Sequence, residues 1–215
     1  MIHSTKLEPA ATTPFGVLKR FARRREPEEM CELCSNALDA GHPHLVEPLS
    51  QKMLCSCEAC AILFSSQQNG LYRRVSRRIV QLTDFRLDDA RWDELYLPIN
   101  LAFFHCSTAA GRVVALYPSP AGAMHSLLSL ESWQGLVDDN PILGEFEADV
   151  EALLVNRVSP RRDYYRVPID ECYKLVGLVR SHWQGLSGGS QVWGVIAEFF
   201  RDLEARAVGG SPCRT

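Results

Sequence analysis

Residues 31–60 read CELCSNALDAGHPHLVEPLSQKMLCSCEAC and contain five of the chain's eight cysteines. Two C-x-x-C pairs fall in this segment, Cys31 with Cys34 and Cys57 with Cys60. Each pair can place two thiolates on one side of a metal ion, and two pairs complete the tetrahedron that Zn²⁺ accepts. The segment therefore predicts one bound metal ion, zinc, held by Cys31, Cys34, Cys57 and Cys60.

Three further side chains in this segment are alternative ligands. Cys55 lies close to Cys57 on an extended stretch, so its thiolate could take the place of a neighbouring one. His42 and His44 offer imidazole nitrogens, which zinc and other transition metals also accept. The sequence alone leaves open which thiol or imidazole completes the site.

The residues between the cysteines predict a small zinc-finger module over residues 28–66. Residues 44–47 and 52–56 can pair as a hairpin, and the helix-like run AILF follows Cys60. A knuckle, a hairpin and a helix that carries two ligands in its first turn form a treble-clef layout. A zinc ribbon, in which both pairs lie on knuckles, is the alternative.

The residues that follow the two cysteine pairs bear on both the fold and the metal. Ser35 and Ala61 stand where the knuckles of zinc ribbons and rubredoxins commonly carry glycine. This departure favours the treble clef and weakens a rubredoxin-like interpretation. Because four thiolates also hold iron, iron is the alternative cofactor.

The rest of the chain predicts a larger second unit after the zinc-finger module, and polar segments at both termini. Residues 1–27 are polar and, toward their end, basic, so we expect a disordered, basic lead-in. Residues 70–207 combine strand-like and helical patterns, which predicts an α+β domain with antiparallel strands and about five helices. Residues 208–215 are expected to form a disordered tail.

Turn residues and apolar spacing predict the elements of this domain. Residues 101–106 and 112–117 flank the turn TAAG and should form a hairpin. A second strand pair is expected at 153–158 and 164–168. Helices are expected at residues 90–95, 130–137, 142–152, 170–183 and 191–207. The fourth helix should be capped by Asp170, because a carboxylate can accept the free N–H groups of a first turn.

Charge and hydropathy limit the classes of partner. A net charge of −3 argues against a function dominated by nucleic acid. The arginine pairs at 73–74 and 77–78 are expected to form a solvated or protein-binding surface, with nucleic acid as the alternative. No apolar run approaches the roughly 18 residues of a membrane span. Residues 1–14 lack the apolar stretch of a secretory signal, so we expect a cytoplasmic protein with reduced thiols.

The remaining reactive side chains predict no active site. Cys106 and Cys172 lie in apolar strand and helix patterns and are expected to be core thiols. His105 adjoins Cys106 on a strand, where neighbours point to opposite faces, which argues against a Cys–His catalytic pair. Because no other nucleophile–base or paired-carboxylate arrangement stands out, an enzyme is the least favoured class.

Many short sequence motifs of this chain resemble those of an uncharacterised bacterial family. They lie between residues 28 and 207 and include CELC, HPHL, CSCEACAILF, YRRV, FRLDDARWDEL, LPINLAFF, GRVVALYPSPAG, ALLVNR, DYYRVPIDECYKLVGLVR and HWQGLSGG. The genes of that family accompany those of actinobacterial-type nickel–iron hydrogenases that take up hydrogen with high affinity. The resemblance implies a set of presumed metal residues: Cys31, Cys34, His44, Cys55, Cys57 and Cys60.

The resemblance also implies a partner, hydrogenase subunits or the proteins that assemble them. Together with the zinc module, it predicts an accessory protein, a maturation factor or complex partner, that acts through protein–protein binding. Two alternatives remain open. One is a rubredoxin-like iron protein that carries electrons for a hydrogenase, and the other is a zinc-module regulator that binds nucleic acid.

Overall fold

The computed structural model describes residues 29–66, 70–158, 161–185 and 188–209. The expected lead-in at 1–27 lies outside these residues. Within the described part, five α-helices accompany two sheets, and antiparallel pairing dominates both sheets. The expected α+β class, with antiparallel strands and about five helices, is confirmed.

The smaller sheet contains the expected hairpin. β1 (His44–Glu47) pairs antiparallel with β2 (Lys52–Cys55), and the register sets His44 opposite Cys55. The helix α2 (Glu58–Ser65) follows β2. β3 (Arg73–Arg74) then pairs with the other edge of β1, which gives the strand order β2-β1-β3. Strand pairing therefore crosses the boundary expected between residues 66 and 70.

The larger sheet has seven strands in the order β10-β4-β9-β8-β5-β6-β7. All neighbouring pairs are antiparallel except β10 with β4. Its strands are β4 (Val80–Gln81), β5 (Leu101–Ser107), β6 (Arg112–Ser119), β7 (Gly122–His125), β8 (Glu151–Asn156), β9 (Asp163–Pro168) and β10 (Val208–Gly209).

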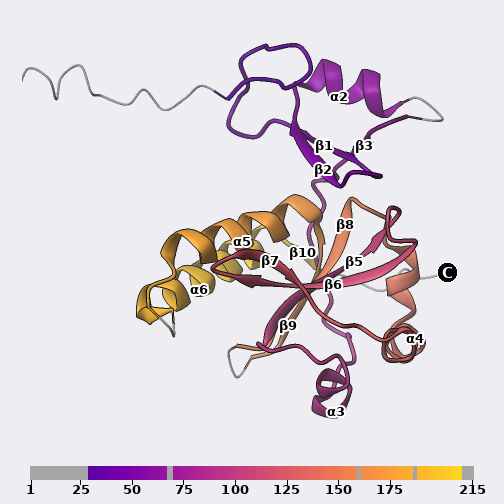
Figure 1. Ribbon diagram of the computed structural model, residues 1–215, viewed down its shortest axis with the longest axis vertical. Helices are drawn as coiled ribbons and strands as arrows, with labels where there is room; N and C mark the ends of the chain where they lie inside the picture. Colours follow the sequence, from indigo (N-terminus) through magenta and orange to yellow (C-terminus); the bar gives the residue numbers. More distant parts are fainter. Residues whose placement is uncertain (1–28, 67–69, 159–160, 186–187, 210–215) are drawn as a thin grey trace, which may run out of the picture.

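Helices cover both faces of this sheet. α5 and α6 lie together on one side, and α3 and α4 lie on the other (Figure 1). Their bounds are α3 (Asp89–Asp93), α4 (Leu130–Asp139), α5 (Ile169–His182) and α6 (Gly189–Arg206), with a 3-10 helix η1 (Pro141–Glu145) after α4. No helix among the described residues has both the length and the apolar character needed to cross a lipid bilayer.

Alternation along the central strands builds two cores, because successive side chains of a strand point to opposite faces. In β5, Leu101 and Phe103 pack toward α5 and α6, whereas Ala102 and Phe104 pack toward α3 and α4. β8 is buried along its whole length. A strand with two buried faces reads as a continuous apolar run, as the sequence LLV within β8 does.

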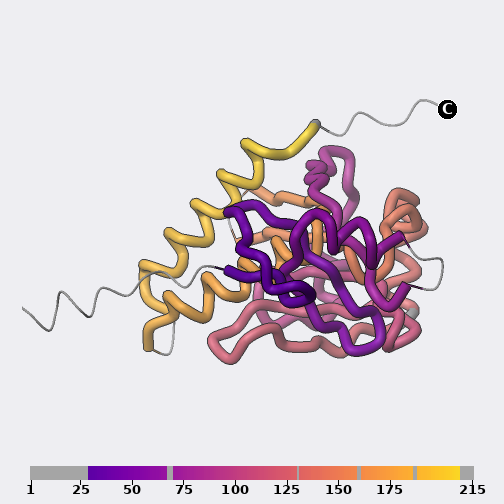
Figure 2. The backbone as a smooth tube through the Cα atoms, turned by 90° about the horizontal axis from the view of Figure 1, so that it is seen from above, coloured from indigo at the N-terminus to yellow at the C-terminus, as the bar shows by residue number. Residues whose placement is uncertain are grey.

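The metal module, which we define as residues 29–66, lies at one end of the molecule (Figure 1) and in front of the larger domain when seen from above (Figure 2). Val46 of β1 belongs to the core beneath α5 and α6, and Met53 of β2 packs against the same core. The side-chain amide of Gln51, in the hairpin turn, donates to the hydroxyl of Ser107 at the end of β5. The hairpin therefore contributes apolar and polar contacts to the domain.

Three expectations about the domain are wrong. Residues 142–152 do not form an α-helix: η1 ends at Glu145, and β8 begins at Glu151. Asp149 has φ 66, a left-handed conformation that an α-helix cannot include. Asp170 lies inside α5, whose N-cap is Pro168. Val208 and Gly209, which were expected to belong to a disordered tail, form β10 beside β4, and residues 210–215 lie outside the described part.

Candidate metal centre

The sulfur atoms of Cys31, Cys34, Cys57 and Cys60 lie within 4.8 Å of one another. The Sγ atoms of Cys34 and Cys57 are 3.7 Å apart. A tetrahedron with metal–sulfur bonds of about 2.3 Å has sulfur–sulfur separations of about 3.8 Å. The four predicted ligands are therefore brought together at a spacing that can hold a metal ion.

The first pair lies on a tight turn closed by backbone hydrogen bonds. The N–H of Ser35 donates to the carbonyl of Cys31 at 2.8 Å, and the N–H of Cys31 donates to the carbonyl of Asn36 at 2.8 Å. Ser35 has φ 59, the left-handed conformation that usually favours glycine. The knuckle therefore keeps its conformation without the glycine that was missing from the sequence pattern.

The second pair lies at the start of a helix. Cys57 is the N-cap of α2, and its sulfur accepts a hydrogen bond from the N–H of Cys60 at 3.5 Å. A helix N-terminus presents N–H groups and a partial positive charge, both of which stabilise a thiolate. A knuckle, the β1–β2 hairpin and a helix with two of the cysteines make the treble-clef order.

Hydrogen bonding gives the two buried thiols of this site, Cys31 and Cys60, very different pKa values. Burial raises the pKa of Cys31, but the N–H groups of Cys57, Leu33 and Cys34 outweigh burial and bring that pKa to about 6. Burial and then the neighbouring thiols raise the pKa of Cys60 to about 12. Like charges at this spacing oppose full ionisation, so a cation is needed for all four cysteines to be thiolates.

The three alternative ligands form a separate group. His42, His44 and Cys55 each offer a ligand atom, and these atoms lie within 4.8 Å of one another. The Nδ1 atom of His44 lies 2.8 Å from Oδ2 of Asp170 in α5. Sequence reasoning missed this role of Asp170 because the two residues are 126 positions apart, and no local spacing relates them.

The other candidate residues belong to neither group of potential ligands. Cys172 is buried as expected, but Cys106 is exposed, so the expectation of a core thiol is wrong for Cys106. His105 beside it is buried, which agrees with the expected opposite orientation of the two. Cys106 shares a face of β5 with Ala102 and Phe104, because alternate residues of a strand point the same way. It lies near the end of the strand, where this face is exposed.

Most of the arginines considered for nucleic-acid binding contact the protein itself. Arg73 donates to the carbonyl of Ala148 at 2.9 Å. Arg74 donates to the carboxylate of Glu58 in α2 at 2.8 Å. Arg77 donates to the carbonyl of Gly41. These side chains hold the metal module and the linker after it in place.

A family model matches residues 30–207, and its description is a family of unknown function, DUF5947. The match begins just before Cys31 and ends after α6, so it covers the four-cysteine group, the His42, His44 and Cys55 group, and most of the larger domain. Comparison with curated proteins and with solved structures gives no match. The chain, with its four-cysteine site and its two sheets, belongs to the DUF5947 family.

Proposed function

We propose that this protein is a hydrogenase-associated accessory protein, a maturation factor or complex partner, whose metal module carries structural zinc and binds another protein. The observation that carries the zinc assignment is the gathering of four cysteine sulfurs within 4.8 Å. Four protein ligands fill a tetrahedral zinc ion and leave no position for a substrate, which is typical of structural sites.

The small core of the metal module supports a structural role for the ion. Its own buried cluster consists of Leu45, Leu54 and Ala61, with Leu33, Phe64 and Tyr72 packed against it. So few apolar side chains bury little surface. Binding of structural zinc contributes on the order of 10–16 kcal/mol in small zinc domains, and that free energy becomes folding free energy.

The outer face of α2 supports protein binding. The side chains of Ile62 and Leu63 are 55% and 59% exposed, and both lie on the helix that carries Cys60. Leu49, in the hairpin turn, is 77% exposed. Adjacent exposed apolar side chains on a rigid element are typical of interaction surfaces. The metal ion would fix the orientation of α2 and so preorganise this face.

The partner class rests on the family resemblance. The strings that carry it include CSCEACAILF, which contains Cys57, Cys60, Ile62 and Leu63. Hydrogenase subunits, or the proteins that assemble them, are therefore the proposed partners of the α2 face. The arginines at 73, 74 and 77 contact the protein itself, so a protein partner is favoured over nucleic acid.

Affinity purification from native cells tests the partner assignment. We expect the tagged protein to retain hydrogenase subunits or assembly proteins, and the double variant Ile62→Asp/Leu63→Asp to lose them while keeping its metal. Leu127→Asp is the matched control, because Leu127 is 91% exposed but lies on the larger domain. Normal hydrogen uptake and a fully assembled hydrogenase in a deletion strain would contradict the proposal.

Elemental analysis tests the metal. We expect zinc and a colourless protein, with loss of the four-cysteine metal in Cys57→Ser, because removal of one thiolate opens the tetrahedron. A red protein that contains iron would instead indicate an electron carrier. A salt-dependent shift of DNA mobility would favour the regulator.

A further inference from the structure

We propose that His42, His44 and Cys55 form a second metal site, which holds one divalent transition-metal ion and keeps one coordination position open. This ion is additional to the one in the four-cysteine site. The inference does not depend on whether that first site carries zinc or iron, nor on which protein the module binds.

The hairpin register positions two of the three donors. His44 in β1 lies directly opposite Cys55 in β2, and such cross-strand neighbours project from the same face of the hairpin. His42 precedes β1, and its ring meets that of His44 edge-on, with centroids 4.9 Å apart and an interplanar angle of 79°. One ligand atom from each residue lies within 4.8 Å of the other two.

The hydrogen bonds of the imidazoles leave Nε2 free on both rings. Nδ1 of His42 lies 3.0 Å from the carbonyl oxygen of Asp39, and Nδ1 of His44 lies 2.8 Å from the carboxylate of Asp170. Both oxygens accept, so both Nδ1 atoms carry the proton and each Nε2 presents a lone pair. Metal-binding histidines commonly show this pattern, with a carboxylate or carbonyl behind the ring.

The Nε2 atom of His42 is the clearest sign of a metal ligand at this site. The side chain of His42 is only 9% exposed, and its Nε2 is buried without a hydrogen-bond partner. A buried acceptor without a partner costs roughly as much as a lost hydrogen bond. A metal ion shared with His44 and Cys55 would satisfy this lone pair.

Asp170 holds His44 from the larger domain. One oxygen of its carboxylate accepts from the N–H of Glu171 at 2.8 Å, and the other bonds to His44. Asp170 and Glu171 belong to the first turn of α5. Asp170 is therefore a positioning residue, and the proposed ion lies where the metal module meets this helix.

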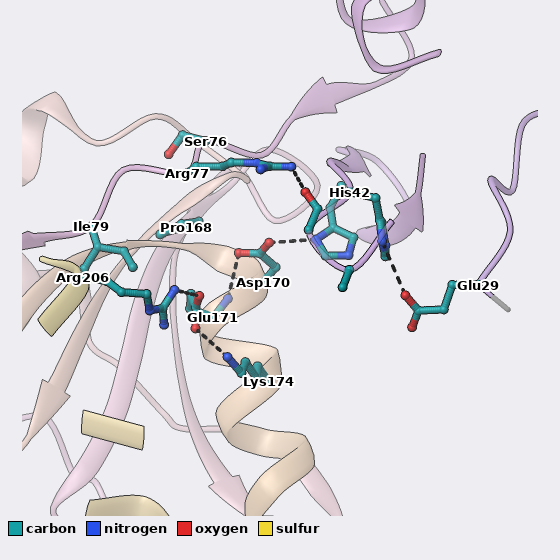
Figure 3. A pocket seen from close by; sticks show the side chains of 13 residues that line it. Glu29, His42, Ser76, Arg77, Ile79, Pro168, Asp170, Glu171, Lys174 and Arg206 are labelled. Carbon is teal, nitrogen blue, oxygen red and sulfur yellow. Dashed lines mark hydrogen bonds and ion pairs between the residues drawn. The ribbon is translucent and has the colours of Figure 1, made fainter. Parts of the chain in front are cut away.

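A pocket of about 550 Å³ lies beside the two histidines of the site, although Cys55 does not line it. His42, His44 and Asp170 line it, together with Glu29, whose carboxylate lies 3.4 Å from Nδ1 of His42. Figure 3 shows Glu29, His42 and Asp170 converging on the pocket from three separate segments. A fourth ligand, either water or a small molecule, would come from this pocket.

The donor set selects the class of metal. Two imidazole nitrogens and one thiolate suit zinc, copper, nickel or cobalt, and do not suit magnesium or calcium, which require oxygen ligands. Three protein ligands with an open fourth position are typical of zinc ions that exchange ligands, in contrast to closed structural sites. The second site thus differs in chemistry from the four-cysteine site.

Titration of the metal-depleted, reduced full-length protein with Zn²⁺ tests the proposal. We expect two equivalents for the wild type and one for Cys55→Ala or His42→Ala. Cys106→Ala, which removes an exposed cysteine elsewhere, should keep two. Asp170→Ala should also bind two, with the second held roughly 10–100-fold more weakly. One equivalent in the wild type, or two in Cys55→Ala, would overturn the proposal.

Cobalt(II) provides a measurement that requires no variant. Its visible spectrum in the wild type should show one tetrathiolate ion and a second ion with mixed nitrogen and sulfur ligands. Addition of imidazole or azide should change only the second spectrum, because only that ion has an open position. A single tetrathiolate spectrum at every cobalt concentration would refute the second site, even if the four-cysteine site is confirmed.

Discussion

Arg73 and Asp149 join the metal module's sheet to the larger domain. Nη1 of Arg73 lies 3.4 Å from Oδ2 of Asp149, and the side chain of Asp149 is only 1% exposed. Asp149 also accepts a hydrogen bond from the N–H of Thr108 at 2.8 Å and another from its hydroxyl. The carboxylate is therefore fully enclosed, and Arg73 supplies the opposite charge.

Replacement of Arg73 by alanine should destabilise the protein by about 1–3 kcal/mol, because it leaves a buried carboxylate without its counter-ion. The free energy of unfolding in urea measures this effect. Lys52→Ala is the control, since Lys52 and its partner Glu32 are 61% and 40% exposed, and its effect should stay within about 0.5 kcal/mol. Equal effects of the two variants would contradict the assigned role of Asp149.

The fragment 70–207 should fold cooperatively without the metal module, because most of both large cores lies within it. Its urea midpoint should be lower than that of the full chain, since Val46 and Met53 no longer cover the core. Extension to residue 209 should raise the midpoint by restoring β10 beside β4. A soluble fragment without a cooperative transition would show that the domain depends on the module.

His105 should make the fold sensitive to acid. Burial lowers its pKa below the ordinary 6.5; the backbone of Cys106 and the charge of Asp149 oppose this effect, and His125 adds to it. Neither ring nitrogen has a hydrogen-bond partner. Because the folded-state pKa lies below the unfolded one, the contribution of His105 is fully present above pH 6.5 and is lost as pH falls through the folded-state pKa.

His105→Phe removes the imidazole and therefore this titration. Acid also releases the metal, but this release affects the variant and the wild type alike, so comparing the two isolates the effect of His105. The measured quantity is the difference in urea midpoint between the variant and the wild type across this pH range. We expect the difference to shift in favour of the variant as the pH falls below 6.5. A difference that is independent of pH would show that His105 does not titrate in the fold.

Alkylation should distinguish Cys106 from Cys172, the two cysteines that the structure describes outside the metal module. Cys106 is exposed, whereas Cys172 is completely buried, and burial raises the pKa of its thiol well above 9.0. Since the thiolate is the reacting species, Cys106 should be labelled in the native protein and Cys172 only after unfolding. Peptide mapping by mass spectrometry measures both. Native labelling of Cys172 would contradict its place in the core.

The sequence predicted those features that depend on neighbouring residues. The spacing of Cys31 to Cys34 and of Cys57 to Cys60 identified one four-cysteine cluster. The hairpin β5–β6 followed from two apolar runs around TAAG, and α6 from apolar residues at helical spacing. In these cases a local pattern and the tertiary structure favour the same conformation.

The features that were missed depend on distant partners. Phe146 and Val150 have the spacing of a helix, which is why a helix was expected at residues 142–152. The chain instead forms β8, which lies between β5 and β9 in the larger sheet. Asp170 was expected only to cap a helix, but one of its carboxylate oxygens accepts from the N–H of Glu171 while the other contacts His44. His42 and Cys55 were considered for the first site, and only the fold shows that they gather around His44.

The separation of 126 residues between His44 and Asp170 also sets an order of events during synthesis. At about 5–20 residues per second, the ribosome adds Asp170 roughly 6–25 seconds after His44. All four cysteines of the first cluster emerge early in that interval, so the nascent module can capture its ion while the surface on which it will rest is still untranslated. The bound ion would then keep the hairpin folded, and α5, which is synthesised later, would complete the second site.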